Sequence, residues 1–267
     1  METMDYNQIK QRAEAWIKEA GNMIKDSFDR ERTITYKSHA ADLVTEMDKS
    51  IERYFIRHIN HEFPDHRVLG EEGYGDNITD ASGVLWIIDP IDGTTNFIHQ
   101  QCNFAVSIGI YFNGIGMLGF IYDVAKDELF TAEKNNGVYL NGQKLPMLQK
   151  TVLEECVFGI NATWLTPNRR FDHTLLLPVV KRSRGTRSYG SAALEMAYVA
   201  AGRLDAYLTM RLSPWDFAAG KILIEEAGGI VTTVYGDEIS LLEQNSVFCG
   251  KPGLHEQVMK ELLSGQK

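Results

Sequence analysis

The chain has 267 residues, 44% of them hydrophobic and 24% charged, a balance typical of a globular protein with a packed core. Its 27 basic and 36 acidic residues give a net charge of -9, which argues against nonspecific binding to nucleic acid or to anionic membranes. The three cysteines are widely spaced and no segment has the pattern of a signal peptide or a membrane span, so we expect a cytoplasmic protein without disulfides.

Two amphipathic helices open the chain. Apolar residues recur at helical spacing from Ile9 to Ile24, and a second helix is expected to start near Thr45 and to stop before Pro64. The short apolar run Val84–Ile88 is typical of a buried strand. Further strands with Asn-Gly turn signals among them are expected at Phe104–Phe112, Gly116–Tyr122, Glu128–Glu133 and Gly137–Leu140.

The second half of the chain alternates between strands and helices. Strands are expected at Val157–Asn161, Asp205–Thr209, Ile230–Val234 and Ser246–Cys249. Helices are expected at Arg170–Lys181, Ser191–Ala201, Trp215–Ala227 and from Leu254 onward. The change of pattern predicts an α+β subdomain over residues 1–148 and an α/β subdomain over residues 149–267, which form one compact unit with a boundary near Pro146–Thr151.

The segment DPIDGTTNF, Asp89–Phe97, directly follows the apolar strand. Asp89 therefore emerges at the carboxyl end of a strand, where open α/β sheets bind their ligands. Because Pro90 cannot donate to a strand ladder, we expect the chain to leave the sheet there. Asp92 follows, and the turn can direct the Ile91 carbonyl toward the same point. Carboxylate and carbonyl oxygens suit Mg²⁺ or Mn²⁺ better than zinc.

The residues after Asp92 suit a phosphate group. Gly93 permits close approach of the backbone, and Thr94 and Thr95 favour the start of a helix whose free N–H groups can hold phosphate oxygens. A bound divalent cation would also offset the net negative charge that repels an anionic substrate. The simpler alternative for the segment is a turn that ends a strand, followed by a helix cap.

Two further acidic segments stand apart from this one. Glu71 and Glu72 lie between Gly70 and Gly73, where the simpler interpretation is a solvated turn. In the segment PWDFAAG, Asp216 opens an apolar helix, where the simpler interpretation is an ordinary N-cap.

In this order and spacing the three segments resemble the inositol monophosphatase family. GEE (residues 70–72) is similar to its first acidic motif, WIIDPIDGTTNF (86–97) to its second, and PWDFAAG (214–220) with EAGG (226–229) to its C-terminal signature. Lys37-Ser38 and DLVTEMD (42–48) resemble its N-terminal loop and helix start. The resemblance covers nearly the whole chain and replaces the three simpler interpretations. It implies a layered α/β/α/β/α sandwich of the sugar-phosphatase type.

The resemblance also implies a set of metal ligands. Glu71, Asp89 and the Ile91 carbonyl match the ligands of a first Mg²⁺. Asp89, Asp92 and Asp216 match those of a second. Two to three ions are implied, because Asp48 and Glu71 resemble supports, through water, for a weaker third site.

The implied reaction is hydrolysis of a phosphate monoester by a metal-activated water. Glu71, Thr94 and Asp48 match the catalytic positions, where Glu71 helps to take the proton of the water and Thr94 orients it. The positions that match substrate contacts are Asp92, Gly93, Thr94, Thr95, Gly190, Ser191, Ala192, Thr209 and Asp216.

Thr209 departs from the animal members of the family, which carry there a glutamate that contacts inositol hydroxyls. Inositol 1-phosphate is the first choice of substrate, while fructose 1,6-bisphosphate, the 2′-phosphate of NADP and 3′-phosphoadenosine compounds are alternatives. A metal-binding regulatory protein with little turnover is an alternative of another class. The resemblance further implies lithium sensitivity and a homodimer. The basic run Lys181–Arg187 is interpreted either as a solvated or dimer-interface surface or as a means of recruiting anions.

Overall fold

The structure is a computed structural model that describes residues 6–28, 34–36 and 43–264. Lys37, Ser38 and Asp42, which contribute to the family resemblance, lie outside the described residues. None of the described helices is long and apolar enough to cross a lipid bilayer.

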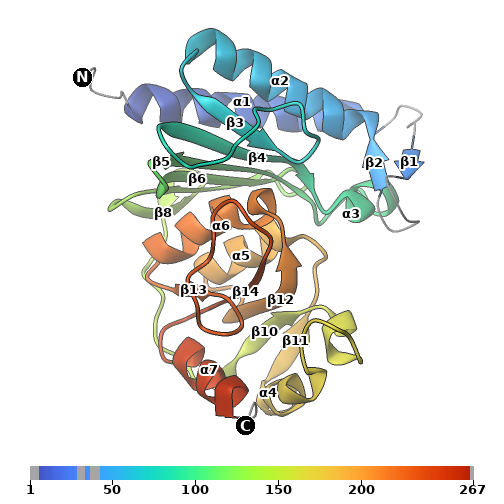
Figure 1. Cartoon of the computed structure of the whole chain (residues 1–267), viewed down its shortest axis with the longest axis vertical. Helices are drawn as coiled ribbons and strands as arrows, with labels where there is room; N and C mark the ends of the chain where they lie inside the picture. Colours follow the sequence, from blue (N-terminus) through green and yellow to red (C-terminus); the bar gives the residue numbers. More distant parts are fainter. Residues whose placement is uncertain (1–5, 29–33, 37–42, 265–267) are drawn as a thin grey trace.

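The chain folds into alternating layers of helix and sheet (Figure 1). The outer helices α1 (Tyr6–Asp26) and α2 (Glu46–Glu62) cover one face of a seven-stranded sheet, and α5 (Ala192–Ala200) and α6 (Pro214–Glu226) cover its other face. A five-stranded sheet lies beyond α5 and α6, and α4 (Leu176–Arg182) and α7 (Leu254–Ser264) pack on its far face. The expected α/β/α/β/α sandwich is confirmed.

The seven-stranded sheet has the strand order β3-β4-β5-β6-β7-β8-β9. Its strands are β3 (Arg67–Gly70), β4 (Val84–Asp92), β5 (Ala105–Phe112), β6 (Ile115–Asp123), β7 (Glu128–Glu133), β8 (Gly137–Leu140) and β9 (Gln143–Lys144). The pair β3–β4 is parallel, with Gly70 opposite Ile88, and the other neighbours are antiparallel. Because parallel strands end at the same edge, the turn after β3 and the end of β4 meet there.

The five-stranded sheet has the order β11-β10-β12-β14-β13. Its strands are β10 (Val157–Ile160), β11 (Gly185–Arg187), β12 (Ala206–Leu212), β13 (Ile230–Thr232) and β14 (Asn245–Gly250). β10 pairs in parallel with β11 and β12, while β14 pairs antiparallel with β12 and β13. The shorter elements are the strands β1 (Ile34–Tyr36) and β2 (Leu43–Thr45), helix α3 (Thr94–His99), and 3-10 turns at Leu153–Glu155, Ala162–Leu165 and His173–Leu175.

The expectation that the chain leaves the sheet at Pro90 is wrong. β4 continues to Asp92, which pairs with Ala105 on β5, and the register shifts between Asp89 and Asp92. A bulge accommodates the missing N–H of Pro90 without ending the strand. Asp89 and Asp92 therefore both stay anchored to the sheet.

The expected helix at Arg170–Lys181 starts later than predicted. The Asp172 carboxylate accepts the Thr174 N–H at 3.0 Å and begins a 3-10 turn, and α4 proper begins at Leu176. The short strands β3 and β11 were not predicted, because each has too few residues to show a period. Most other helices and strands lie within a few residues of their expected positions.

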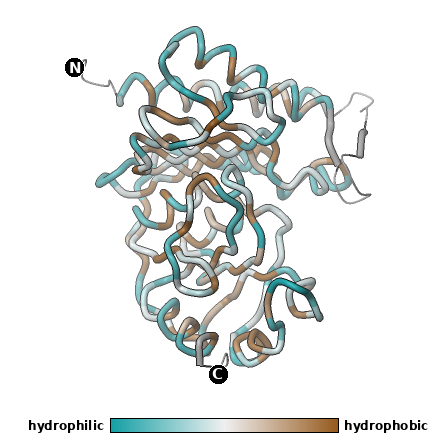
Figure 2. The backbone as a smooth tube through the Cα atoms, in the orientation of Figure 1, coloured by the Kyte–Doolittle hydropathy of each residue, from teal (hydrophilic) through white to brown (hydrophobic). Residues whose placement is uncertain are grey.

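The central helices are held closely against the seven-stranded sheet, and hydrophobic segments gather along the strands and these helices (Figure 2). Every residue of α5 is buried, as expected of a helix that is apolar on all sides. A Cβ on Gly109 would lie 2.9 Å from the Ala218 Cβ, and one on Gly119 would lie 2.9 Å from the Ala219 carbonyl oxygen. These glycines let α6 approach β5 and β6, which positions the start of α6 beside β4.

Candidate active site

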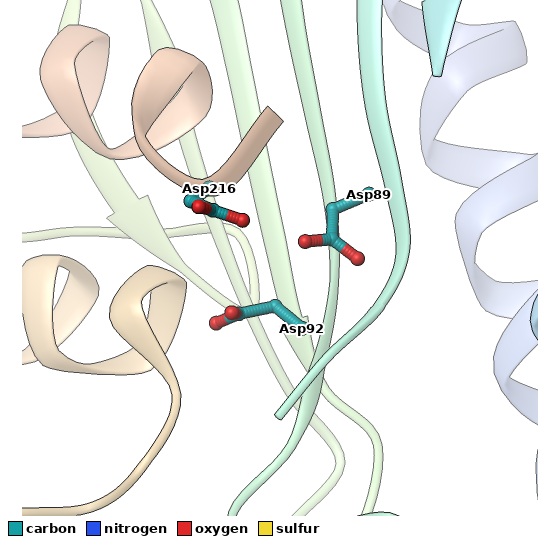
Figure 3. Close-up of side chains that lie close together, drawn as sticks. All are labelled: Asp89, Asp92 and Asp216. Carbon is teal, nitrogen blue, oxygen red and sulfur yellow. The ribbon is translucent and has the colours of Figure 1, made fainter. Parts of the chain in front are cut away.

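Three aspartates from distant parts of the sequence meet between the seven-stranded sheet and the central helices. Carboxylate oxygens of Asp89, Asp92 and Asp216 lie within 4.8 Å of one another. Asp89 and Asp92 lie on β4 and Asp216 lies in the first turn of α6 (Figure 3). Asp89 is only 1% exposed and Asp92 8%.

Backbone N–H groups hold each of the three carboxylates. Asp89 Oδ1 accepts the Ile91 N–H at 3.0 Å, and Asp216 Oδ2 accepts the Ser213 N–H at 2.7 Å. Asp216 therefore stabilises the start of α6, as the simpler interpretation requires, and still faces Asp89 (Figure 3). Asp92 Oδ2 accepts the N–H of Ala193 at 2.7 Å and a hydrogen bond from the Ser191 hydroxyl.

The cluster carries more negative charge than its surroundings balance. Burial, followed by the charges of Glu71, Asp92, Asp216 and Asp48, raises the pKa of Asp89 well above its ordinary value. Burial is also the main cause that raises the pKa of Asp92 to about 6 and that of Asp216 to about 8. Such repulsion is relieved by a bound cation, and a site of carboxylate oxygens without histidine or cysteine fits Mg²⁺ or Mn²⁺.

Glu71 and Asp48 lie beside this cluster but not within it. The half-buried Glu71 follows β3, whose parallel pairing with β4 brings it to Asp89, and among the charges it is the largest cause of the raised Asp89 pKa. Asp48, near the start of α2, is 1% exposed. Thr94 donates its hydroxyl to the Ile91 carbonyl at 3.1 Å and to Asp48 Oδ1 at 3.5 Å. Thr94 and Asp48 are thus neighbours, and Glu71 lies near Asp89.

Gly93 lies between β4, which ends at Asp92, and α3, which begins at Thr94. Its φ of 92° is in the left-handed region that favours glycine, and it precedes α3. A Cβ there would lie 3.1 Å from the Asn103 carbonyl oxygen and 3.2 Å from the Ser191 Cβ. The predicted close approach at Gly93 is therefore present, while the neighbouring Thr95 is exposed.

A cavity of about 310 Å³ opens from the aspartates toward the five-stranded sheet. Its lining includes Asp92, Asp216, Thr209 and the predicted substrate loop at Gly190, Ser191 and Ala192. Thr209 is 5% exposed, and its hydroxyl accepts a hydrogen bond from the indole N–H of Trp164 at 3.1 Å. The remaining lining residues are Asn161, Thr163, Trp164, Ser188, Glu195, Tyr207 and Leu212.

Glu52 is a buried residue of the site that sequence reasoning missed. It is 0% exposed on α2, and its two carboxylate oxygens accept the N–H groups of Glu72 at 2.7 Å and Tyr74 at 2.8 Å. It therefore holds the turn that carries Glu71. One available signal was its spacing of four residues from Asp48, which places both carboxylates on one face of a helix.

Glu195 and Asn96 were also missed, and together they hold the substrate loop. Glu195 Oε1 accepts the Tyr189 N–H at 2.8 Å, and the Asn96 side-chain amide donates to the Tyr189 carbonyl at 2.7 Å. Burial raises the pKa of Glu195 to about 7, and its Oε2 has no hydrogen-bond partner among the described residues. The signal for Glu195 was a lone carboxylate in the apolar helix AALEMAYVA.

The basic run Lys181–Arg187 divides between the end of α4 and the edge strand β11. Arg182 pairs with Glu154 at 2.5 Å and also with Glu261. Residues 181–187 are absent from the lining of the cavity beside the aspartates.

Comparison with known proteins places this site in a family. The model of the inositol monophosphatase family matches residues 5–267. The chain is 54% identical over 263 residues to the inositol-1-monophosphatase of Bacillus subtilis (strain 168), with 98% of this chain and 99% of that protein covered. It is 37% identical to the fructose-1,6-bisphosphatase/inositol-1-monophosphatase of Thermotoga maritima, with 91% of each covered.

Solved structures agree. The crystal structure of inositol monophosphatase-II from Staphylococcus aureus MSSA476 matches with a TM-score of 0.88 at 40% identity. The match covers 97% of this chain and 94% of that one. The chain belongs to the inositol monophosphatase family, a family of metal-dependent phosphatases.

Proposed function

We propose that the protein hydrolyses inositol 1-phosphate to inositol and phosphate in a magnesium-dependent reaction. The observation that carries the proposal is the group of three aspartates, two of them buried and Asp216 partly buried, whose oxygens lie within 4.8 Å of one another. The name of the Bacillus subtilis relative, with which this chain shares 54% identity, supports the choice of substrate.

The ligand roles proposed for the acidic residues follow their placement. Glu71, Asp89 and the Ile91 carbonyl would hold one Mg²⁺, and Asp89, Asp92 and Asp216 a second. Asp48 with Glu71 would support a weaker third ion. When bound, such ions lower the pKa of a coordinated water and stabilise negative charge on phosphoryl oxygens.

Thr94 and Glu71 would act on the attacking water. The Thr94 hydroxyl is oriented by the Ile91 carbonyl, to which it donates at 3.1 Å. Thr94 would therefore align the water through its free lone pairs, while Glu71 would accept the water's proton. General-base catalysis of this kind needs an acceptor within hydrogen-bond reach of the attacking water.

The substrate would lie in the 310 Å³ cavity beside the aspartates. The N–H groups of residues 93–95 would hold the phosphate oxygens, and the loop at residues 190–192 would contact the leaving group together with Asp92 and Asp216. Thr209 would meet a substrate hydroxyl with a neutral side chain. A neutral contact discriminates less strongly among polyols than a buried charge does.

Release of inorganic phosphate tests the proposal directly. The panel contains inositol 1-phosphate, fructose 1,6-bisphosphate, NADP and a 3′-phosphoadenosine compound, each with Mg²⁺ and with a chelator. We expect the highest kcat/KM for inositol 1-phosphate, dependence on Mg²⁺, and inhibition by lithium. Silence across the panel would instead support a metal-binding regulatory protein, and a higher kcat/KM for another ester would replace the substrate.

We also propose a homodimer. Sedimentation velocity with Mg²⁺ at several protein concentrations measures the oligomeric state. A monomer at all concentrations would contradict this proposal without affecting the reaction.

A further inference from the structure

Two buried side-chain atoms of the described residues have no hydrogen-bond partner: the hydroxyl oxygen of Ser107 and Oε2 of Glu195. Glu195 lines the cavity beside the aspartates. Ser107 lies on β5 and is 0% exposed, which separates its hydroxyl from bulk water. A buried hydroxyl without a partner is destabilising, and its presence next to a candidate active site calls for a functional explanation.

Ser107 faces the candidate metal ligands. In the register of the seven-stranded sheet it lies directly opposite Asp89 on β4 and Ile121 on β6. Side chains that are directly opposite across antiparallel strands share a face of the sheet, with Cβ atoms about 5 Å apart. This face is the one that α6 covers, since a Cβ on Gly109, two residues along β5, would lie 2.9 Å from the Ala218 Cβ. Of the two cross-strand neighbours of Ser107, only Asp89 has a polar side chain.

A second carboxylate on this face of the sheet, Asp123 on β6, is already occupied. Its Oδ1 accepts the backbone N–H of Lys126 at 3.1 Å. Its Oδ2 accepts the Lys126 ammonium at 2.9 Å and the Tyr198 hydroxyl at 3.1 Å. Asp89 is therefore the better acceptor for the Ser107 O–H.

Asp89 has the capacity for a further hydrogen bond. A carboxylate has about four lone-pair sites. Asp89 Oδ1 accepts the Ile91 N–H at 3.0 Å, and the proposed bridging of two ions uses two more sites, so one remains for a donor. A bound cation keeps the carboxylate ionised, and an ionised carboxylate accepts stronger hydrogen bonds than a protonated one. Metal binding therefore favours donation by Ser107.

We propose that Ser107 is a positioning residue of the metal centre, whose hydroxyl donates to the Asp89 carboxylate when Mg²⁺ is bound and fixes the orientation of that ligand. The inference rests on the proposed function, because it requires Asp89 to be a metal ligand. Removal of a group that hydrogen-bonds to a metal ligand weakens metal binding or activity by roughly 10–100-fold. In this role Ser107 itself contacts neither the metal nor the substrate.

The test measures Mg²⁺ binding and stability separately in Ser107→Ala. Melting temperatures are recorded in a chelator and over a series of Mg²⁺ concentrations, and calorimetric titration with Mg²⁺ gives the dissociation constant. The control is Ser27→Ala. Ser27 is a buried serine just after α1, on the opposite side of the sheet, and its hydroxyl donates to the Ile24 carbonyl at 2.7 Å.

We expect Ser107→Ala to raise the dissociation constant for Mg²⁺ about tenfold and to reduce the increase in melting temperature at a fixed Mg²⁺ concentration. In the chelator its melting temperature should equal or exceed that of the wild type, because alanine removes a hydroxyl that has no partner among the described residues. Ser27→Ala should show the reverse pattern: a lower melting temperature in the chelator, from the lost hydrogen bond, and unchanged Mg²⁺ affinity.

Three results would overturn the inference. One is equal Mg²⁺ affinity in the wild type and Ser107→Ala. Another is a fall in the melting temperature of Ser107→Ala in the chelator as large as that of Ser27→Ala, because the hydroxyl would then serve the packing between β5 and α6. The third is an equal loss of Mg²⁺ affinity in Ser27→Ala, because weaker binding would then follow from lower stability alone.

Failure of the proposed function looks different. A wild type that binds Mg²⁺ but releases no phosphate from inositol 1-phosphate contradicts the reaction, and the dissociation constants still test Ser107. A wild type that does not bind Mg²⁺ contradicts the ligand roles and this inference together. If the wild type binds Mg²⁺ and releases phosphate, unchanged affinity in Ser107→Ala contradicts the inference alone.

Discussion

The buried carboxylate of Glu52 accepts the backbone N–H of Glu72 at 2.7 Å, so that helix α2 holds the acidic turn after β3. The other Glu52 oxygen accepts the Tyr74 N–H at 2.8 Å. A Cβ on Gly70 would lie 2.5 Å from this carboxylate, so the chain passes directly over it. Glu71 is consequently positioned by a residue that need not contact a metal or the substrate.

Replacement of Glu52 by alanine should therefore damage both stability and metal binding. It removes the charged acceptor of two partly buried N–H groups, which costs about 3 kcal/mol of unfolding free energy, and the Mg²⁺ concentration for half-maximal activity should rise. Glu52→Gln keeps one acceptor oxygen, so its stability and its Mg²⁺ dependence should lie between those of the wild type and Glu52→Ala. The control is Lys49→Ala on the same helix, since Lys49 pairs at 2.8 Å with the exposed Glu46 and such surface pairs contribute little to stability. An unchanged Mg²⁺ dependence in Glu52→Ala would refute the positioning role.

Asp89→Asn should retain the fold and lose turnover. The asparagine oxygen can still accept the Ile91 N–H, which Asp89 accepts at 3.0 Å. Removal of the central charge should lower kcat by ~10³-fold or more, as for other major electrostatic contributors. In a chelator, the same change should raise the melting temperature, because it relieves repulsion among buried carboxylates. Near wild-type turnover with Mg²⁺ would contradict the proposed ligand role.

The stability of the metal-free protein should fall as the pH rises. The folded pKa of Asp216 is about 8 and that of Asp92 about 6, above the ordinary value of 3.8. At a pH between the unfolded and the folded pKa values, the folded protein binds more protons than the unfolded chain. The stabilisation that these two carboxyl groups contribute is therefore complete below the unfolded pKa and is lost as the pH rises through the folded pKa values.

Thermal melts between about pH 5 and pH 8 measure this effect. In a chelator the melting temperature should decrease across the range, and the increase produced by Mg²⁺ should grow with pH, because the ion competes with protons. Asp216→Asn should flatten the decrease. A Mg²⁺ shift that is larger at low pH would contradict the assignment.

Glu195 should influence substrate affinity through the loop that it holds. Glu195→Ala removes the acceptor of the Tyr189 N–H, and we expect KM for inositol 1-phosphate to rise about tenfold with a smaller change in kcat. Glu195→Gln keeps one acceptor oxygen and should restore KM to near the wild-type value. The variant Glu256→Ala is the control, because the exposed Glu256 of α7 likewise accepts a backbone N–H, that of Gly253 at 2.6 Å. If glutamine and alanine raise KM equally, the carboxylate acts otherwise than through the loop.

Local patterns predicted much of the fold. Helical and strand periods located α1, β5 and β12, because the spacing of apolar residues follows from the element itself and from the need to bury one face. Glycine and asparagine predicted the turns, because these residues readily adopt the backbone conformations that tight turns require. The bulge at Pro90 was missed, since the gain that keeps β4 in the sheet comes from pairing of Asp92 with Ala105 on another strand.

The candidate site divides in the same way. The sequence by itself determined the oxygen-rich chemistry, because Asp89 and Asp92 stand three residues apart in a distinctive motif with Gly93 and Thr94. Only the tertiary structure decided that Asp216 lies within 4.8 Å of them and that Glu52 holds the acidic turn. These relationships join residues distant in the chain, and the burial and pairing energies that set them depend on the packing of whole layers.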